Sequence, residues 1–335
     1  MNDYSDYLET QELTNLTWTL SNGTLTISGE GDMDDFDFHV IDDGYHSETF
    51  CTAPWWKKGA YKLIKTIVIQ DGVTSIGELA FFKCYNVTEV VIPKSVTTIR
   101  AGAFADCRNL STIRLPDGLK ILGASDTEGD NLSSFGVFEM CSSLTNVTIP
   151  AGVVTIGENA FFECDKLESI YIPDSVEHIG ASAFAGCISL REVQLGTHVR
   201  SVGKKTFKDC EKLTSVKIPG QVTVIPRKMF KNCKKLSDVT ISRGIVRIGS
   251  EAFFDCKDLN TIKIPNGMRE IGEAAFMHCP LTKVHIPDSV TLIEPNAFWD
   301  CNLTVVGLPA KIKVGKDAFE DEVRIVRRKE RPAAE

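Results

Sequence analysis

Cysteine is the residue type in this sequence whose spacing most invites a chemical interpretation. Ten of the eleven cysteines stand three residues after a phenylalanine, and most follow one another at intervals of 23 residues. These ten are Cys84, Cys107, Cys141, Cys164, Cys187, Cys210, Cys233, Cys256, Cys279 and Cys301. Thiols at regular intervals can form disulfides, bind a metal as thiolates, or pack as small apolar side chains.

Stacking geometry favours the third of these roles. If each cysteine belongs to one coil of a stack, successive thiols point the same way and lie about 4.8 Å or more apart. A disulfide needs two Cβ atoms about 3.5 to 4.5 Å apart, and zinc needs four ligands that converge on one point. We therefore expect ten buried, unpaired thiols and neither a metal nor a cofactor. Cys51 lies outside this register, and its sequence context leaves both a reactive and a packed thiol open.

Residues that could support catalysis are scattered through the chain. The six histidines fall at different positions in different repeats: His39, His46, His178, His198, His278 and His285. The sequence contains no G-x-S-x-G, H-E-x-x-H or phosphate-binding loop. A hydrolase would need a nucleophile, a base and an orienting group in one pocket. The sequence therefore predicts no catalytic residues and no enzyme.

Charged residues are unevenly distributed. Residues 1–50 hold twelve Asp or Glu and no Lys or Arg, within a chain of net charge -8. The carboxylates of GEGDMDDFDFHVIDDG, residues 29–44, do not follow the calcium-loop order, so an acidic, solvated loop is favoured over a calcium site. The basic run we single out is RRKER, residues 327–331. Nucleic acid is not an expected partner.

An internal repeat must position all of these residues. Phenylalanine recurs with a dominant spacing of 23 at Phe81, Phe104, Phe138, Phe161, Phe184, Phe207, Phe230, Phe253, Phe276, Phe298 and Phe319. The unit reads V-x-x-I-G-x-x-A-F-x-x-C-x-x-L-x-x-V-x-I-P. A period held over this many copies predicts a solenoid.

Each repeat carries two local signals. Ala160, Phe161, Cys164 and Leu167 fall on one face of a short helical turn. The following SIYIP, residues 169–173, alternates instead, which indicates a strand that the proline ends. One coil cannot bury its own apolar face, so neighbouring coils must stack and their strands must pair in parallel.

These motifs resemble a known family. The L-x-x-V-x-I-P strand joined to A-F-x-x-C, from Lys62 to Val326, resembles the BspA-like leucine-rich repeats of bacterial and protist surface proteins. LTWTLSNGTLTISGEG and the later APWW look like the cap of such arrays, and Asn22-Gly23 independently signals a β-hairpin. The resemblance implies an α/β solenoid: a horseshoe of about eleven coils with parallel strands on the concave face, preceded by a small β-hairpin cap.

Three regions follow from the repeat and the resemblance. We expect an acidic N-terminal cap with a β-hairpin at 1–61, the leucine-rich repeat solenoid at 62–326 and a basic C-terminal tail at 327–335. An insertion at about 124–134 interrupts the period, and both a binding loop and a neutral loop are consistent with it. The VRIVRRKER end predicts a last strand with a solvated basic edge.

Function is sought on the exposed strand positions, which vary from coil to coil. The resemblance implies a non-enzymatic binding or adhesion protein that recognises a protein or glycan through the concave face. The candidate ligand-binding residues are Arg114, Tyr171, Glu192, Gln194, Lys217, Lys263 and His285. The alternative is a structural spacer or self-associating scaffold without a specific ligand, and the oligomeric state is open.

The location of the protein has two interpretations. The resemblance points to the cell surface or the extracellular space. Unpaired thiols, and a sequence in which we expect no secretory signal and no membrane span, suit the alternative of a reducing cytoplasm.

Overall fold

The computed structural model describes residues 13–42, 47–124 and 135–329. The chain divides into two compact units, Met1–Leu167 and Glu168–Glu335. Among the described residues, no helix is both long enough and apolar enough to cross a membrane.

The first unit begins with a hairpin that is continuous with the repeats. Strands β1 and β2 pair antiparallel around Asn22 and Gly23, and both turn residues have positive φ, as a two-residue hairpin requires. Strand β2 then pairs in parallel with β6. The elements are β1 (Leu16–Ser21), β2 (Thr24–Gly29), β3 (Gly31–Asp32), β4 (Phe38–Asp42), β5 (Ser47–Cys51), the 3-10 segment η2 (Pro54–Leu63), β6 (Thr66–Ile69), β7 (Val73–Ile76), β8 (Glu89–Val91), β9 (Thr98–Arg100), β10 (Thr112–Ile113), β11 (Ile121–Ala124), β12 (Asn146–Val147) and β13 (Thr155–Ile156).

The second unit consists of repeats that end in a last paired strand, β28. Its elements are β14 (Ser169–Tyr171), β15 (His178–Ile179), β16 (Glu192–Gln194), β17 (Ser201–Val202), β18 (Ser215–Ile218), β19 (Val224–Ile225), β20 (Asp238–Ile241), β21 (Arg247–Ile248), β22 (Thr261–Lys263), β23 (Glu270–Ile271), β24 (Lys283–His285), β25 (Leu292–Ile293), β26 (Val305–Leu308), β27 (Lys313–Val314) and β28 (Arg324–Arg327). Strand β28 pairs in parallel with β26, and all four of its residues are exposed.

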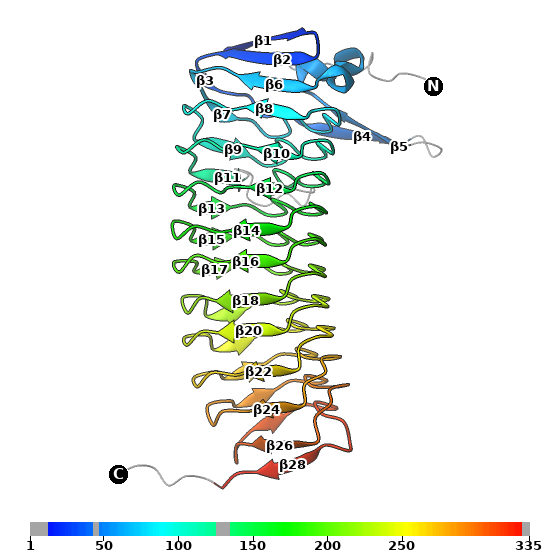
Figure 1. The fold of residues 1–335 in the computed structure, drawn as a ribbon, viewed down its shortest axis with the longest axis vertical. Coiled ribbons are helices and arrows are strands. Elements are labelled where there is room, and N and C mark those ends of the chain that lie inside the picture. Colours follow the sequence, from blue (N-terminus) through cyan, green and yellow to red (C-terminus); the bar gives the residue numbers. More distant parts are fainter. Residues whose placement is uncertain (1–12, 43–46, 125–134, 330–335) are drawn as a thin grey trace. The chain divides into compact units, whose positions relative to one another are not determined.

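A typical coil contributes two short strands, each of which pairs in parallel with the equivalent strand of a neighbouring coil (Figure 1). In the second unit, β18 pairs with β20 and β19 pairs with β21, both in parallel and with an offset of 23 residues. The first ladder comes from the V-x-I-P segment that the sequence predicts as a strand. The second comes from the V-x-x-I-G segment, which the sequence analysis does not identify as one.

The A-F-x-x-C segment forms hydrogen-bonded turns, where the sequence predicts a helical turn. The backbone N–H groups of Lys205, Phe207 and Asp209 donate to carbonyls of the next coil at 2.8 to 3.0 Å. Lys205 and Asp209 are both in the left-handed region, with φ of 62°. Because an α-helix excludes left-handed residues, the backbone bonds to the neighbouring coil instead. The helical part of the predicted α/β class is therefore minimal.

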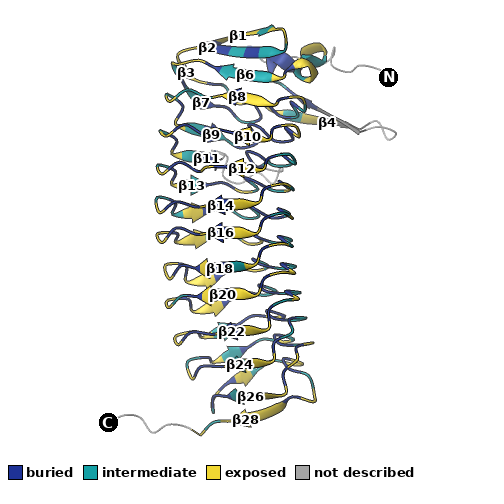
Figure 2. Cartoon of the chain, in the orientation of Figure 1, coloured by how far each residue is buried: buried dark blue, intermediate teal, exposed yellow. Residues whose placement is uncertain are grey.

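Phenylalanine rings form the centre of the core in both units. In the first unit Trp55, Phe81, Phe104, Phe138 and Phe161 stack with centroids 5.3 to 5.6 Å apart. In the second unit the stack runs from Phe184 to Phe319 with separations of 5.2 to 5.6 Å. Figure 2 shows buried and exposed residues alternating along the coils, and the stacked phenylalanines are among the buried ones. The spacing of one ring per coil explains the 23-residue period.

The main fold prediction is confirmed: the chain forms stacked coils with parallel strands, preceded by the Asn22-Gly23 hairpin. The final basic strand is also confirmed, as β28. The predicted insertion loop at 124–134 lies, beyond Ala124, outside the described residues. The boundaries at 61 and 326 stay predictions.

Candidate binding surface

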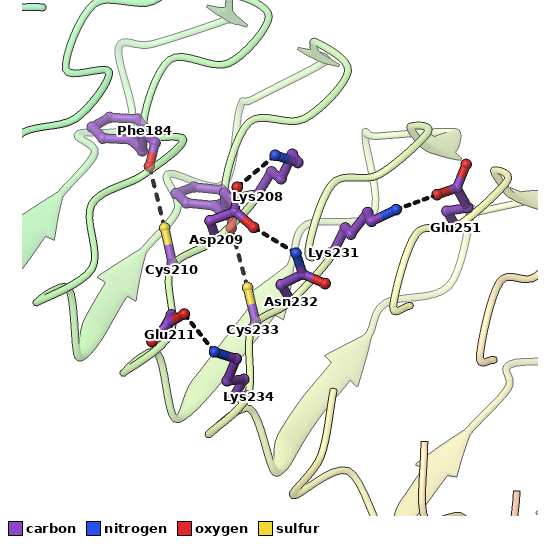
Figure 3. A network of polar contacts seen from close by, with 11 residues as sticks. Phe184, Lys208, Asp209, Cys210, Glu211, Lys231, Asn232, Cys233, Lys234 and Glu251 are labelled. Atoms are coloured by element: carbon purple, nitrogen blue, oxygen red, sulfur yellow. Dashed lines mark hydrogen bonds and ion pairs between the residues drawn. The ribbon is translucent and has the colours of Figure 1, made fainter. Parts of the chain in front are cut away.

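The repeated cysteines lie inside the coils and donate to main-chain carbonyls. The Sγ atoms of Cys210 and Cys233 lie 3.2 and 3.1 Å from the carbonyl oxygens of Phe184 and Phe207 in the preceding coil (Figure 3). All eleven cysteines are buried. Burial raises the pKa of the Cys210 and Cys233 thiols well above the usual value. Cys51 is packed as well: its Sγ faces the Leu79 carbonyl, and burial raises its pKa to about 12.

This arrangement predicts that no ladder cysteine is in a disulfide. In denaturant without reductant, all ten ladder thiols should react with iodoacetamide and be counted by intact-protein mass spectrometry. In the native protein the same thiols should resist alkylation, because they are buried and protonated. Mass shifts that appear only after reduction would contradict the ladder.

The clustered carboxylates of the N-terminal region contact separate protein groups. Asp32 accepts a hydrogen bond of 2.6 Å from the Thr74 hydroxyl, which lowers its pKa. Asp34 accepts from the backbone N–H and the hydroxyl of Thr14. Asp35 accepts from the backbone N–H of Glu78. Asp32 and Asp35 thus link the cap segment to the first coil, and Asp34 joins two parts of the cap, which gives these carboxylates a structural role.

The seven candidate ligand-binding residues are all exposed. Six lie on strands of the second unit: Tyr171 on β14, Glu192 and Gln194 on β16, Lys217 on β18, Lys263 on β22 and His285 on β24. The seventh, Arg114, directly follows β10 in the first unit. Alternation places these side chains outside because the residues between them, such as Ile170 and Val193, are buried.

Parallel pairing brings some of these residues together. Tyr171 lies level with Gln194, and Glu192 lies level with Ser169 on one side and Ser215 on the other. Lys263 lies level with His285 farther along the unit. A contact area shared by Arg114 and Tyr171 stays a prediction.

His285 lines a pocket of about 520 Å³. The other lining residues are Asn266, Asp288, Ser289, Arg328 and Lys329. Arg328 reaches back from the end of β28, bonds Asp288 at 2.8 Å and donates to the Ile286 carbonyl. The sequence analysis did not connect Arg328 with His285, because 43 residues separate them and no repeat position relates them.

Known proteins support the assignment of the repeats. Three overlapping segments, residues 60–135, 133–260 and 223–327, match the family described as the BspA type leucine-rich repeat region. A solved leucine-rich repeat protein from Bacteroides ovatus is 24% identical, covering 95% of this chain and 100% of its own, with a TM-score of 0.53. A solved leucine-rich cell surface protein from Faecalibacterium prausnitzii is 23% identical, with 96% of each chain covered and a TM-score of 0.50. No curated protein matched the chain.

The family match spans both units and includes the coils that carry the exposed strand residues. The two solved structures share the fold of stacked repeats over nearly the whole length. Sequence period, parallel ladders and family match agree, and the chain therefore belongs to the BspA-type leucine-rich repeat family.

Proposed function

We propose that the chain is a non-enzymatic binding protein that recognises a protein or glycan through the exposed face of the first strand of each coil. Tyr171 is the observation that carries this proposal. Tyr171 is 53% exposed although it lies on a paired strand. Among the described residues, we find no hydrogen bond or ring contact of its side chain. An exposed aromatic side chain on a hydrogen-bonded strand is a typical anchor of an interface.

Polar groups surround this anchor. Gln194 offers an amide level with Tyr171, and Glu192 offers a carboxylate two residues earlier on the same face of β16. An aromatic face next to hydrogen-bonding side chains fits either a protein surface or the polar edge of a sugar. A surface location is part of the proposal, and the related Faecalibacterium prausnitzii protein is named a cell surface protein.

The pocket at His285 supports a binding role over catalysis. His285, Asp288 and Ser289 are residue types of a hydrolytic triad, and all three line the pocket. Asp288, however, is paired with Arg328, and the Ser289 hydroxyl accepts the backbone N–H of Gly267 at 3.0 Å. Neither group is committed to orienting His285 or to acting as a nucleophile.

The second candidate is a spacer without a specific ligand. The strand face beyond Tyr171 favours it, because Ser215, Lys217, Thr240, Thr261 and Lys263 form an evenly polar surface. The two candidates differ in one respect: only the binding protein needs Tyr171.

Replacing Tyr171 by alanine should weaken binding of a captured partner at least tenfold, about 1.4 kcal/mol. The partner is obtained by affinity capture from host and bacterial extracts, and its affinity is then measured by biolayer interferometry. The melting temperature should barely change, because the side chain is exposed.

Tyr171→Phe is the matched control, since it keeps the ring and removes only the hydroxyl. It should retain most of the affinity. An equal affinity for wild type and Tyr171→Ala would remove the anchor from the proposal, and failure to capture any partner would favour the spacer.

A further inference from the structure

We propose a second binding surface, on the turn side of two consecutive coils of the second unit, that binds a linear anionic polysaccharide. We call it the basic band. It consists of Lys204, Lys205, Lys208, Lys212, Arg227, Lys228, Lys231, Lys234 and Lys235, all in or beside the turns around Phe207 and Phe230. It lies on different segments of the coil from the strand residue Tyr171, so it goes beyond the function proposed above.

The basic band is a positively charged segment in a chain whose net charge is negative. Residues 204–235 contain ten Lys or Arg and two Asp or Glu, whereas the whole chain carries a net charge of -8. The segment does not stand out as a basic run in the sequence, because the basic residues are interleaved with the apolar positions of the repeat. Stacking of the coils gathers them.

Coil stacking places like charges next to one another. Residues 23 apart occupy equivalent positions in the two coils, whose Phe207 and Phe230 rings are 5.6 Å apart. Four such positions hold a cation in both coils: Lys204 and Arg227, Lys205 and Lys228, Lys208 and Lys231, and Lys212 and Lys235. Like charges at equivalent positions of adjacent coils repel one another and oppose folding.

The fold itself does not require these cations. In the preceding coil, the same four positions hold Ala181, Ser182, Ala185 and Ser189. In the following coil they hold Ser250, Glu251, Phe254 and Asp258. The coils thus accept neutral or acidic residues at these places, so the repulsion is specific to the basic band. An anionic ligand would remove that repulsion.

Neighbouring carboxylates compensate only part of the band (Figure 3). Glu251 forms ion pairs with Lys231 at 2.6 Å, Lys228 at 3.3 Å and Arg227 at 3.4 Å. Burial opposes ionisation of Glu251, but these lysines hold its pKa below the usual value. Three cations thus share one negative charge.

Three further lysines have a carboxylate partner. Lys208 of the first coil pairs with Asp209 at 2.5 Å, and in the second coil Lys234 pairs with Glu211 at 2.6 Å and Lys235 pairs with Asp258 at 3.1 Å. In contrast, Lys204, Lys205 and Lys212 of the first coil are exposed and form no ion pair with any described residue. These three are the cations most available to a ligand.

The dimensions of the band favour a narrow polymer. Two coils span about 10 Å, and the next coil presents Glu251, Asp255 and Asp258. A DNA duplex, whose major groove alone is about 12 Å wide, would extend over these carboxylates. Single-stranded nucleic acid needs exposed aromatic rings for base stacking, but Phe207 and Phe230 are fully buried, and the half-buried Phe254 ring beside the band is covered by Lys231, 4.3 Å from its centroid. A single polysaccharide chain with sulfate or carboxylate groups can lie along the band.

The test uses the full chain and size-defined oligosaccharides in isothermal titration calorimetry between 50 and 300 mM NaCl. A heparin octasaccharide carries sulfate and carboxylate, and a hyaluronan octasaccharide carries carboxylate alone. We expect at least one of them to bind. The triple variant K204Q/K205Q/K212Q should weaken that binding at least tenfold and reduce the slope of log Kd against log salt by about 2, since each cation contributes about 0.7 for single-chain polyanions.

The matched control is K94Q/K120Q/K166Q, which removes the same charge from three exposed positions in separate coils of the first unit. Its affinity should stay within twofold of wild type. At low salt, the melting temperature of the band variant should equal or exceed that of wild type, because repulsion is relieved. Absence of binding to both oligosaccharides at 50 mM NaCl, equal losses in both variants, or tighter binding of a DNA duplex or an acidic peptide would overturn the proposal. Loss of binding with Tyr171→Ala tests only the strand face.

Discussion

Replacing Phe230 by alanine is expected to lower the free energy of unfolding by about 3 to 5 kcal/mol, the range for large aromatic side chains removed from a packed interior. Phe230 is fully buried, and its ring stacks on Phe207 at 5.6 Å and on Phe253 at 5.3 Å. Alanine would leave a cavity between two coils, because the backbone bonds to each neighbour hold the turns in place. Urea denaturation followed by circular dichroism measures the loss.

Two control variants test this expectation. Phe230→Leu keeps much of the volume and should cost clearly less than alanine. Lys217→Ala, on the exposed face of β18, should change stability by less than about 0.5 kcal/mol. Equal shifts of the denaturation midpoint for Phe230→Ala and Lys217→Ala would show that the assignment of inside and outside is wrong.

The second large effect concerns the start of the first unit, where Trp55→Ala should also cost about 3 to 5 kcal/mol. Trp55 is fully buried and stacks on Phe81 at 5.4 Å, so it takes the place of a repeat phenylalanine. Trp18 and Phe36 contact its edges, and its Nε1 donates to the Ala80 carbonyl at 2.8 Å. Its removal would weaken the packing of the hairpin region on the first coil, leaving the β2–β6 pairing as the main remaining link.

Limited proteolysis and thermal denaturation together test this role. Trp55→Ala should expose sites before residue 64 to cleavage while later coils stay protected. Trp55→Phe keeps the stack and loses only the indole hydrogen bond and part of the contact area, so its loss should be smaller. If both variants were as resistant as wild type, Trp55 would not join the cap to the array.

The repeat signal was sufficient to predict the core. Phe207 and Cys210 could be assigned to the interior from their period alone, because an apolar residue that recurs once per coil must meet its copies in the neighbouring coils. The Asn22-Gly23 hairpin was equally local, since its two residues need only their own backbone preferences to form the turn. In both cases the information lies within one repeat or one turn.

The prediction of a helical turn was wrong, and the spacing of the apolar residues gives no sign of the reason. Asp209 and Asn232 have positive φ, a conformation that both residue types tolerate better than most. Their backbone N–H groups bond the next coil, and the apolar residues still face inward. Apolar residues at positions i, i+1, i+4 and i+7 therefore occur both in a helix and in this turn. Only the hydrogen bonds between coils distinguish the two.

The candidate sites divide in the same way. By itself, the sequence determined the family, the parallel coils and the exposure of Tyr171, because alternation along one strand decides which side chains face outward. Only the tertiary structure decided that Arg328 meets His285 and that lysines 23 residues apart lie side by side. Such proximities depend on how separate coils and chain ends pack. The repulsion within a lysine column arises between adjacent coils, and no property of a single repeat encodes it.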